Sequence, residues 1–257
     1  MDLGYEWFIQ KIYERSGIDL RYYKRTQMER RINALMRSMN IDNYAEYLRL
    51  LVREPAHYRK FIDHLTINVS EFYRNPQHWE VLEKKILPEL KAANAHLKIW
   101  SAGCSTGEEP YTLAIIVSEQ LRGTQSRILA TDIDRGVLAK AKEGVYSSKA
   151  VANVPPRLLE KYFERNGDHF VVRDSLKQLI TWRQHDLLCD EFPTQCDLIL
   201  CRNVVIYFTE DAKSKLYQRF AQALRKGGVL FIGSTEQIFQ ARELGLSTKA
   251  TFFYQKN

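Results

Sequence analysis

The chain has 257 residues, of which 45% are hydrophobic and 27% are charged, and this composition is typical of an ordinary globular protein. It excludes a disordered, collagen-like or fibrous chain, and the absence of any run of 18 apolar residues argues against a transmembrane helix. The formal net charge of +7 is compatible with an acidic partner, and the length corresponds to one or two domains.

The N-terminus and the cysteines predict a cytoplasmic protein. Residues 1–6 are mixed and acidic, without the basic and apolar regions of a secretory signal. The four cysteines, Cys104, Cys189, Cys196 and Cys201, form no C-x-x-C pair. We therefore expect reduced thiols and no metal site.

The first ninety-odd residues are predicted to be helical. From Met28 to Met39, apolar residues recur at i, i+4, i+7, i+8 and i+11, which makes one stripe along a helix. Further helices are expected at about 43–52, 56–65 and 76–90, and no strand is expected. We interpret residues 1–70 as a helical domain and residues 71–95 as a helical linker.

From Lys98 onward, short β-rich runs alternate with helical ones. Strands are expected at 98–102, 127–131, 197–201, 229–232 and 251–254, with helices at 110–122, up to 142, and at 211–225, the last closed by Gly227–Gly228. This alternation predicts a doubly wound, Rossmann-like α/β domain over residues 96–257. Within it, runs at 170–172 and 179–182 predict a small antiparallel insertion over about 146–186.

A glycine turn follows the first of these strands, and ligands of open α/β sheets bind at the carboxyl ends of strands. The turn reads G-C-S-T-G-E-E-P from Gly103 to Pro110. Its spacing does not fit a dinucleotide or P-loop motif, and Glu108 and Glu109 would repel a phosphate at the helix N-terminus. A nucleoside that carries positive charge and no phosphate, such as S-adenosylmethionine, suits this turn better.

The second strand ends in two acidic residues, Asp132 and Asp134. An acidic residue at this point is the usual acceptor for ribose hydroxyls, and Asp132 at the strand tip is the better candidate. Asp134 has an alternative interpretation as the N-cap of the following helix.

A serine hydrolase is the rival interpretation of the same turn. Residues 103–107 are a literal G-x-S-x-G, the nucleophile elbow of α/β-hydrolases, with Ser105 as nucleophile. That triad needs a histidine late in the chain, and no histidine follows His185.

Five segments together resemble one family, the CheR-type chemotaxis receptor methyltransferases. They are T-I-N-V-S-E-F-Y-R-N at 66–75, W-S-A-G-C-S-T-G-E-E-P-Y at 100–111, A-T-D-I-D at 130–134, C-R-N-V-V-I-Y-F at 201–208 and G-S-T-E at 233–236. They occur in the family's order and span nearly the whole chain.

The resemblance implies a protein-glutamate O-methyltransferase that uses S-adenosylmethionine, forms S-adenosylhomocysteine, and acts on cytoplasmic helices of chemoreceptors. Two residues map near the transferred methyl group, Arg74 and Tyr207. The residues that map onto the cofactor pocket, together with the glycine turn, are Asn68, Ser70, Arg74, Gly103, Glu109, Asp132, Asp186, Leu187, Arg202, Asn203 and Val204. From position alone, Arg74 is equally explained by pairing with Glu71, and Tyr207 by packing in a core.

Lys24, Arg31 and Arg37 map onto a basic helix that contacts the receptor. Residues 21–37 carry six basic side chains and one acidic one. A nucleic-acid-binding helix or an ordinary solvent-exposed helix face can have the same excess of basic residues. We favour the acidic receptor surface and expect no nucleic acid and no membrane insertion. The alternative function is a catalytically silent nucleoside-binding regulatory module.

Some family members bind a pentapeptide at the receptor's tail through a glycine-rich loop in the small insertion. Here the corresponding turn is only residues 165–169, so we predict that this tethering is absent or weak.

Overall fold

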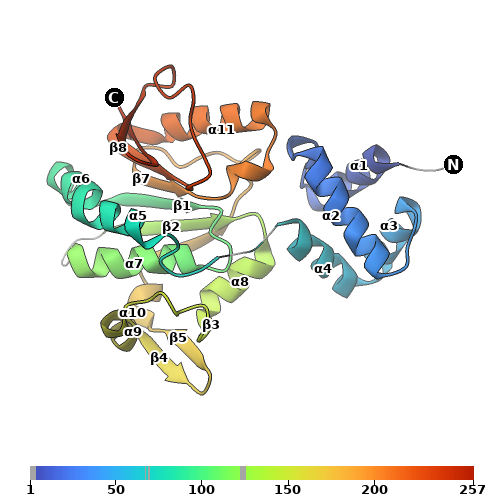
Figure 1. Ribbon diagram of the computed structural model, residues 1–257, viewed down its shortest axis with the longest axis horizontal. Coiled ribbons are helices and arrows are strands. Elements are labelled where there is room, and N and C mark those ends of the chain that lie inside the picture. The colour runs from blue at the N-terminus through green and yellow to red at the C-terminus, as the bar shows by residue number, and fades with distance from the viewer. Residues whose placement is uncertain (1–3, 67, 69, 122–125) are drawn as a thin grey trace. The chain divides into compact units, whose positions relative to one another are not determined.

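The computed structural model describes residues 4–66, 68, 70–121 and 126–257, and the chain divides into two compact units. The first comprises Met1–Asn68 and Tyr207–Lys213, and the second comprises Val69–Ile206 and Ser214–Asn257. Figure 1 labels their helices and strands. In the described part of the chain, no helix is both long and apolar enough to cross a membrane.

The first unit is helical. Its helices are α1 (Tyr5–Ser16), the short 3-10 helix η1 (Leu20–Tyr22), α2 (Arg25–Ser38), α3 (Tyr44–Arg53) and α4 (Pro55–Leu65). The predicted stripe of α2 is confirmed, because Met28, Ile32, Leu35 and Met36 are its buried residues. The ring of Phe8 packs against Tyr47 and Phe61 at 5.7 and 5.9 Å between centroids, so aromatic contacts join α1, α3 and α4.

A short segment from late in the chain completes this unit. The backbone N–H of Lys24 donates to the Tyr207 carbonyl at 2.9 Å, and that of Thr209 donates to the Tyr22 carbonyl at 2.8 Å. The rings of Tyr23 and Phe208 pack edge to face at 4.8 Å. Tyr207 and Lys24 are therefore held beside each other by backbone hydrogen bonds.

The second unit contains a sheet of seven strands among the described residues, in the order β6-β2-β1-β7-β8-β10-β9. The strands are β1 (Lys98–Ala102), β2 (Arg127–Asp132), β6 (Ile180–Gln184), β7 (Cys196–Cys201), β8 (Leu224–Ile232), β9 (Leu246–Ala250) and β10 (Phe253–Lys256). The first five in this order are parallel, and β10 is antiparallel to both of its neighbours. The Rossmann-like α/β fold is thereby confirmed, with the carboxyl ends of β1, β2, β6, β7 and β8 at one edge.

Helices lie before the first strand and between later ones, and Figure 1 labels the α-helices. Before β1 come α5 (Pro76–Val81), the π-helical turn η2 (Leu82–Ile86) and α6 (Leu87–Ala93), and between strands come α7 (Glu108–Gln120), α8 (Arg135–Glu143) and α11 (Glu210–Ala223). The helix predicted over 76–90 is interrupted by the π turn because Pro88 has no N–H for an α-helical bond, and Leu87 N–H bonds to the Leu82 carbonyl instead. The end of the helix predicted at Arg122 lies outside the described residues.

Three features of the sheet differ from the sequence predictions. The sequence places the run at 179–182 in the antiparallel insertion, but β6 pairs in parallel with β2 in the main sheet. Strand β9 was not predicted, because it is a mostly exposed edge strand without a buried apolar run. Gly227 and Gly228 lie inside β8, next to a shift in its register with β7, and not at the end of α11.

The small antiparallel sheet is present, with strand order β3-β5-β4 (Figure 1). It comprises β3 (Val145–Ser147), β4 (Phe163–Asn166) and β5 (His169–Val172), with α9 (Pro156–Tyr162) and α10 (Asp174–Lys177) beside it in sequence. Glu119 of α7 accepts hydrogen bonds from Arg157, Lys161 and Tyr162, which ties α9 to the main domain. Only Gly167 and Asp168 connect β4 to β5, so weak or absent pentapeptide tethering stays a prediction.

Candidate functional site

The glycine turn between β1 and α7 is tightly fitted to its surroundings. The N–H groups of Gly103 and Cys104 both donate to the Thr131 carbonyl at the end of β2, at 2.8 and 2.9 Å. Gly103 has φ +80°, and a Cβ there would lie 2.5 Å from Cγ2 of Val204, which follows β7. Glycine is therefore required at position 103 both for its backbone conformation and for the close approach of the β7 loop.

Asp132 at the tip of β2 supports this turn. Its Oδ2 accepts the Ser105 N–H at 2.8 Å and its Oδ1 accepts the Asp134 N–H at 3.0 Å. Burial raises the pKa of Asp132 to about 6, although these two bonds oppose the shift. Asp134 caps α8 by accepting the Gly136 N–H at 2.7 Å, which confirms its interpretation as an N-cap. Of these two acids, Asp132 therefore remains the predicted acceptor for a ribose.

We expect the affinity for S-adenosylhomocysteine to fall as the pH drops from 8 to 5, with a midpoint near 6. Ribose hydroxyls that donate to Asp132 stabilise its ionised form, so binding should release a proton below the pKa of about 6. The free protein responds in the opposite direction. Because burial penalises the ionised form of Asp132, this group makes the fold about 3 kcal/mol more stable below pH 3.8 than above pH 6, and the difference is lost as the pH rises through 6.

Calorimetry across this pH range, in buffers of different ionisation enthalpy, measures both the affinity and the released proton. The matched control is Asp132→Asn, which should bind more weakly but with a flat profile between pH 5 and 7. A wild-type affinity that is constant over the range would contradict the role of Asp132.

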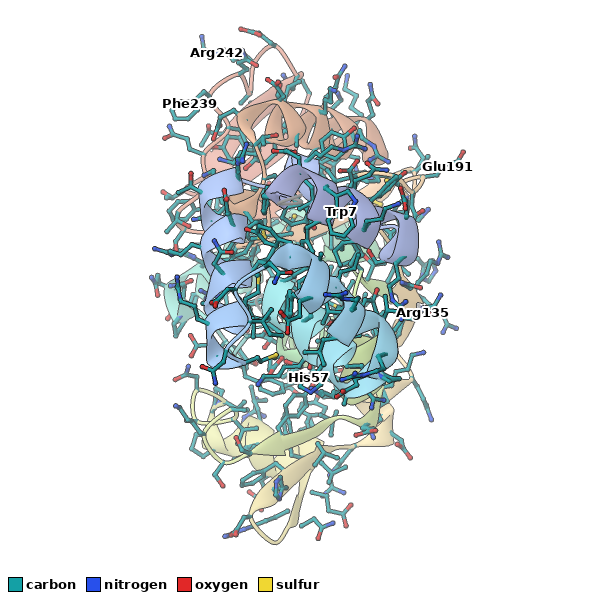
Figure 2. The ribbon with its side chains drawn as sticks, turned by 90° about the vertical axis from the view of Figure 1, so that its right-hand side faces the viewer. Trp7, His57, Arg135, Glu191, Phe239 and Arg242 are labelled. Atoms are coloured by element: carbon teal, nitrogen blue, oxygen red, sulfur yellow. The ribbon has the colours of Figure 1, made fainter. Side chains whose placement is uncertain are left out.

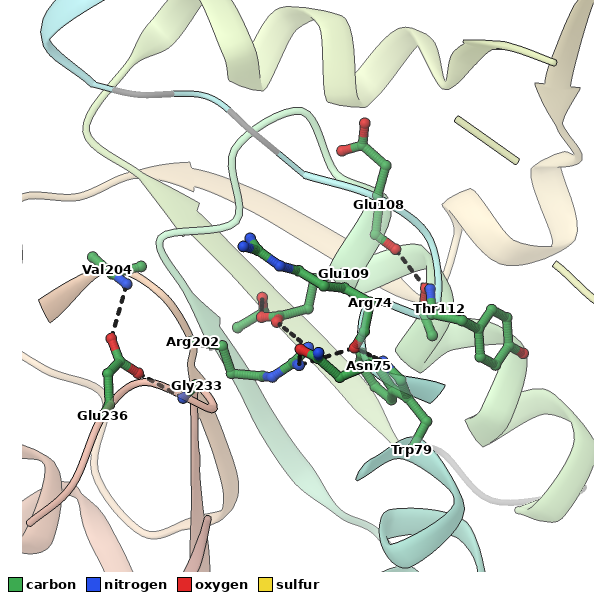
Figure 3. Close-up of polar contacts among 12 residues, drawn as sticks. Arg74, Asn75, Trp79, Glu108, Glu109, Thr112, Arg202, Val204, Gly233 and Glu236 are labelled. Carbon is green, nitrogen blue, oxygen red and sulfur yellow. Dashed lines mark hydrogen bonds and ion pairs between the residues drawn. The ribbon is translucent and has the colours of Figure 1, made fainter. Parts of the chain in front are cut away.

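A buried ion pair lies under the first turn of α7 (Figure 3). Arg202, which follows β7, donates from Nη1 to Oε2 of Glu109 at 3.3 Å, and the Ser101 hydroxyl donates to Oε1 at 3.0 Å. The Arg202 side chain is 2% exposed and that of Glu109 is 14% exposed. Burial raises the pKa of Glu109, while Arg202 and Ser101 counteract the increase.

Arg202 also fixes the segment that carries Arg74. Its Nη2 donates to the Arg74 carbonyl at 2.9 Å and to Oδ1 of Asn75 at 3.2 Å, and the indole N–H of Trp79 reaches the same carbonyl at 3.0 Å. With its side chain 2% exposed, Arg202 offers almost no surface to a ligand, so we interpret it as a residue that positions Arg74 and Glu109. The direct cofactor contact predicted for it stays a prediction. The Arg74 side chain extends away from these bonds (Figure 3).

The loop after β7 is shaped by a residue that sequence reasoning missed, Glu236. Its carboxylate accepts the N–H of Val204 at 3.1 Å and that of Gly233 at 2.5 Å (Figure 3). Burial raises the pKa of Glu236, and its bonds to backbone N–H groups oppose the increase. Asn203 has φ +59°, and its Oδ1 is buried without a hydrogen-bond partner among the described residues. A ligand with a donor group, such as an ammonium, would satisfy this oxygen.

Two further predicted pocket residues of the second unit follow β6. Asp186 accepts the Leu188 N–H on Oδ1 at 2.8 Å, and Leu187 is 7% exposed. Because β6 neighbours β2, the carboxyl ends of these two strands place Asp186 and Asp132 along the same edge of the sheet. Ser70 begins the segment that leads to Arg74 and lies in this unit.

Five predicted residues lie in the first unit: Lys24, Arg31, Arg37, Asn68 and Tyr207. Arg37 is exposed, whereas the guanidinium of Arg31 is half-buried and bonds to the carbonyl of His64 at the end of α4. Burial also lowers the pKa of Arg31. Arg31 therefore has a clear role within the helical unit, besides any contact with a partner.

The position of His185 does not support the serine hydrolase alternative. Ser105 does have the left-handed backbone of a nucleophile elbow, with φ +48°. However, Nε2 of His185 lies 3.1 Å from the Glu191 carbonyl, and its ring packs between Trp100 and Phe192 at 5.5 and 5.7 Å. His185 is thus held as a core residue and is not poised as a general base.

The donor set fits a cationic nucleoside. Among the described residues, no three His, Cys, Asp or Glu side chains converge as a metal site. The first turn of α7 carries two carboxylates, Glu108 and the Arg202-paired Glu109, which disfavours a phosphate there. The Asn203 oxygen, which has no partner among the described residues, requires a donor. Together with the fold, these features define the class of Rossmann-like S-adenosylmethionine-dependent methyltransferases.

Comparison with known proteins identifies the family. The family model "CheR methyltransferase, SAM binding domain" matches residues 68–253, and "CheR methyltransferase, all-alpha domain" matches residues 3–66. The chain is 39% identical over 257 residues to a chemotaxis protein methyltransferase of Listeria innocua, covering 100% of this chain and 98% of that protein. It is 35% identical over 263 residues to one of Borreliella burgdorferi, covering 97% of this chain and 92% of that protein.

A third relative is chemotaxis protein methyltransferase 2 of Pseudomonas aeruginosa, which is 34% identical over 252 residues, 95% of this chain and 90% of that protein. This chain therefore belongs to the CheR methyltransferase family. The resemblance found in the sequence and the expected cofactor, S-adenosylmethionine, are both confirmed by the two family models.

Proposed function

We propose that this protein transfers the methyl group of S-adenosylmethionine to glutamate side chains on the cytoplasmic helices of chemotaxis receptors. The observation that carries the proposal is the full-length similarity to proteins named chemotaxis protein methyltransferase. The basic face of α2, with exposed Arg37, supports an acidic protein partner, because surface charge of opposite sign steers association.

The reaction needs alignment more than acid–base chemistry. A glutamate carboxylate has an ordinary pKa near 4.3 and is already a nucleophile at neutral pH, so no general base is required. When bound, S-adenosylmethionine supplies an electrophilic methyl group on a positively charged sulfur. As the oxygen–carbon bond forms and the carbon–sulfur bond breaks, opposite charges cancel, so a site with little water favours the change. Positioning can contribute about 7–11 kcal/mol.

Arg74 and Tyr207 are the proposed groups at the reacting atoms. The main chain of Arg74 is fixed by Trp79 and Arg202, so its planar guanidinium can hold a carboxylate with two parallel hydrogen bonds. Glu109 and Asn203 would take the cofactor's ammonium, and Asp132 its ribose. Tyr207, held through its carbonyl by Lys24, would close the site or orient an oxygen of the substrate.

The experiment is methyl transfer from methyl-labelled S-adenosylmethionine to the cytoplasmic fragment of a chemoreceptor from the same organism. We expect label on the receptor that mild base releases as methanol, because a glutamate methyl ester is base-labile while N-methyl and S-methyl groups are not. A receptor fragment with its helix glutamates changed to alanine is the control and should remain unlabelled. Base-stable label would contradict glutamate O-methylation, and cofactor binding without any label would favour the silent regulatory module.

A further inference from the structure

The turn after β6 is held by more than its own residues. Besides the bond from Leu188 to Asp186, Oδ2 of Asp190 accepts the Asp186 N–H at 2.8 Å. This turn begins the connection to β7, and the side chain of Glu191 in the same connection points to solvent (Figure 2). Two bonds between neighbouring residues shape the turn, but they do not attach it to the domain.

The His185 N–H, just before the turn, donates to the Asp132 carbonyl at 2.9 Å, and Arg219 of α11 attaches the turn itself. Its Nη1 donates to the Leu187 carbonyl at 2.5 Å, and its Nη2 donates to the Asp190 carbonyl. The guanidinium also lies 3.9 Å over the ring of Phe192, which packs on Trp100 at 4.8 Å. One planar group therefore grips both ends of the turn and anchors it to the aromatic core, which a lysine cannot do.

The polar groups left over in this turn match one edge of adenine. Among the described residues, the Leu187 N–H and Oδ2 of Asp186 have no hydrogen-bond partner. A donor beside an acceptor complements a base edge with a ring-nitrogen acceptor beside an amino donor, as adenine has. Hypoxanthine presents the reversed pattern, a ring N–H beside a carbonyl. Recognition of the base then depends on where the Leu187 peptide is held.

We propose that Arg219 is a positioning residue that fixes residues 186–190 for recognition of the adenine ring, and so sets the protein's preference for an adenosyl cofactor. The proposal rests on the assignment of Asp186 and Leu187 to the cofactor pocket. Arg219 itself touches neither cofactor nor substrate. It acts through the Leu187 and Asp190 carbonyls.

The test compares the affinities for S-adenosylhomocysteine and S-inosylhomocysteine by calorimetry in the wild type, Arg219→Lys and Arg219→Ala. The wild type should prefer the adenosyl compound. Both variants should lose adenosyl affinity on the order of tenfold to a hundredfold, as expected for two charged hydrogen bonds, and inosyl affinity much less. Arg157→Ala is the control, because it removes from α9 an arginine that pairs with Glu119 and should leave both affinities unchanged.

Equal losses for the two compounds, or no loss for either, would overturn the proposal. An arginine that only stabilises the fold would affect the affinities for both compounds alike and would leave the preference for adenine unchanged. Arg219 is half-buried, and Arg219→Lys keeps its positive charge there. The lysine variant therefore provides a folded protein for the test even if Arg219→Ala destabilises α11. A wild type without adenosyl preference would refute the adenine-reading turn itself. Receptor methylation by the wild type is measured in a separate experiment. A failure of the proposed methyltransferase function can therefore be distinguished from a failure of the proposal for Arg219.

Discussion

Gly103→Ala should abolish tight cofactor binding and cost about 2–5 kcal/mol of folding stability. The left-handed backbone of Gly103, φ +80°, costs an alanine about 1–2 kcal/mol. The new methyl group would also lie 2.5 Å from Cγ2 of Val204, and overpacking of this kind costs about 1–3 kcal/mol. Val204 cannot simply retreat, because its N–H is bonded to Glu236. Relief must come from displacing the turn or the β7 loop, and both carry residues of the predicted cofactor pocket.

Gly17→Ala separates backbone strain from the clash. Gly17 has nearly the same φ, +76°, but no atom lies within 4 Å of a Cβ built there. It should lose about 1 kcal/mol in urea unfolding and keep its affinity for S-adenosylhomocysteine. The double variant Gly103→Ala/Val204→Ala removes the obstructing methyl groups and should recover part of the lost affinity. Undiminished binding by Gly103→Ala, or no recovery in the double variant, would show that this contact does not shape the pocket.

The elements that were predicted best are those whose own residues carry a clear hydrophobic pattern. Strand β1 begins and ends as expected, because every residue from Ile99 to Ala102 is buried and apolar or small. The stripe of α2 was equally visible from its spacing. The hydrophobic patterns were misleading where the choice of partner strand decided which sheet a strand joins. The run at β6 looks the same whether it pairs in parallel with β2 or within the small sheet, and only the tertiary structure distinguishes them.

The candidate site shows the same division. Gly103 and Asp132 could be chosen from the sequence, because a glycine turn followed by an acidic strand end has a physical meaning of its own. Arg202 and Glu236 act through long-range contacts, with Arg74 at one end of the domain's sequence and with Val204 after β7. No local spacing encodes such contacts. For Glu236 the available signal was a buried acid in a G-S-T-E turn, which the resemblance marked but gave no role.

Arg202→Met should be the most destabilising substitution in the second unit that leaves side-chain volume nearly unchanged. It removes the cation from a pair whose side chains are 2% and 14% exposed, and it leaves Glu109 without its buried partner. Breaking a buried pair in this way costs about 3–5 kcal/mol. The Arg74 carbonyl and Asn75 lose donors at the same time, so the Arg74 segment should loosen and methyl transfer should fall together with stability.

Adding Glu109→Gln to Arg202→Met distinguishes the charge from the hydrogen bonds. The double variant no longer buries an unpaired carboxylate, so urea unfolding should show most of the lost stability restored. Transfer should stay low, because Arg74 is still not held and the cofactor's ammonium has also lost the proposed Glu109 carboxylate. Arg157→Met is the control for the same substitution at an exposed pair. Its side chain is 73% exposed, and about 0–1 kcal/mol is expected. A double variant that regains transfer along with stability would mean that Arg202 serves only to neutralise Glu109 and does not position Arg74.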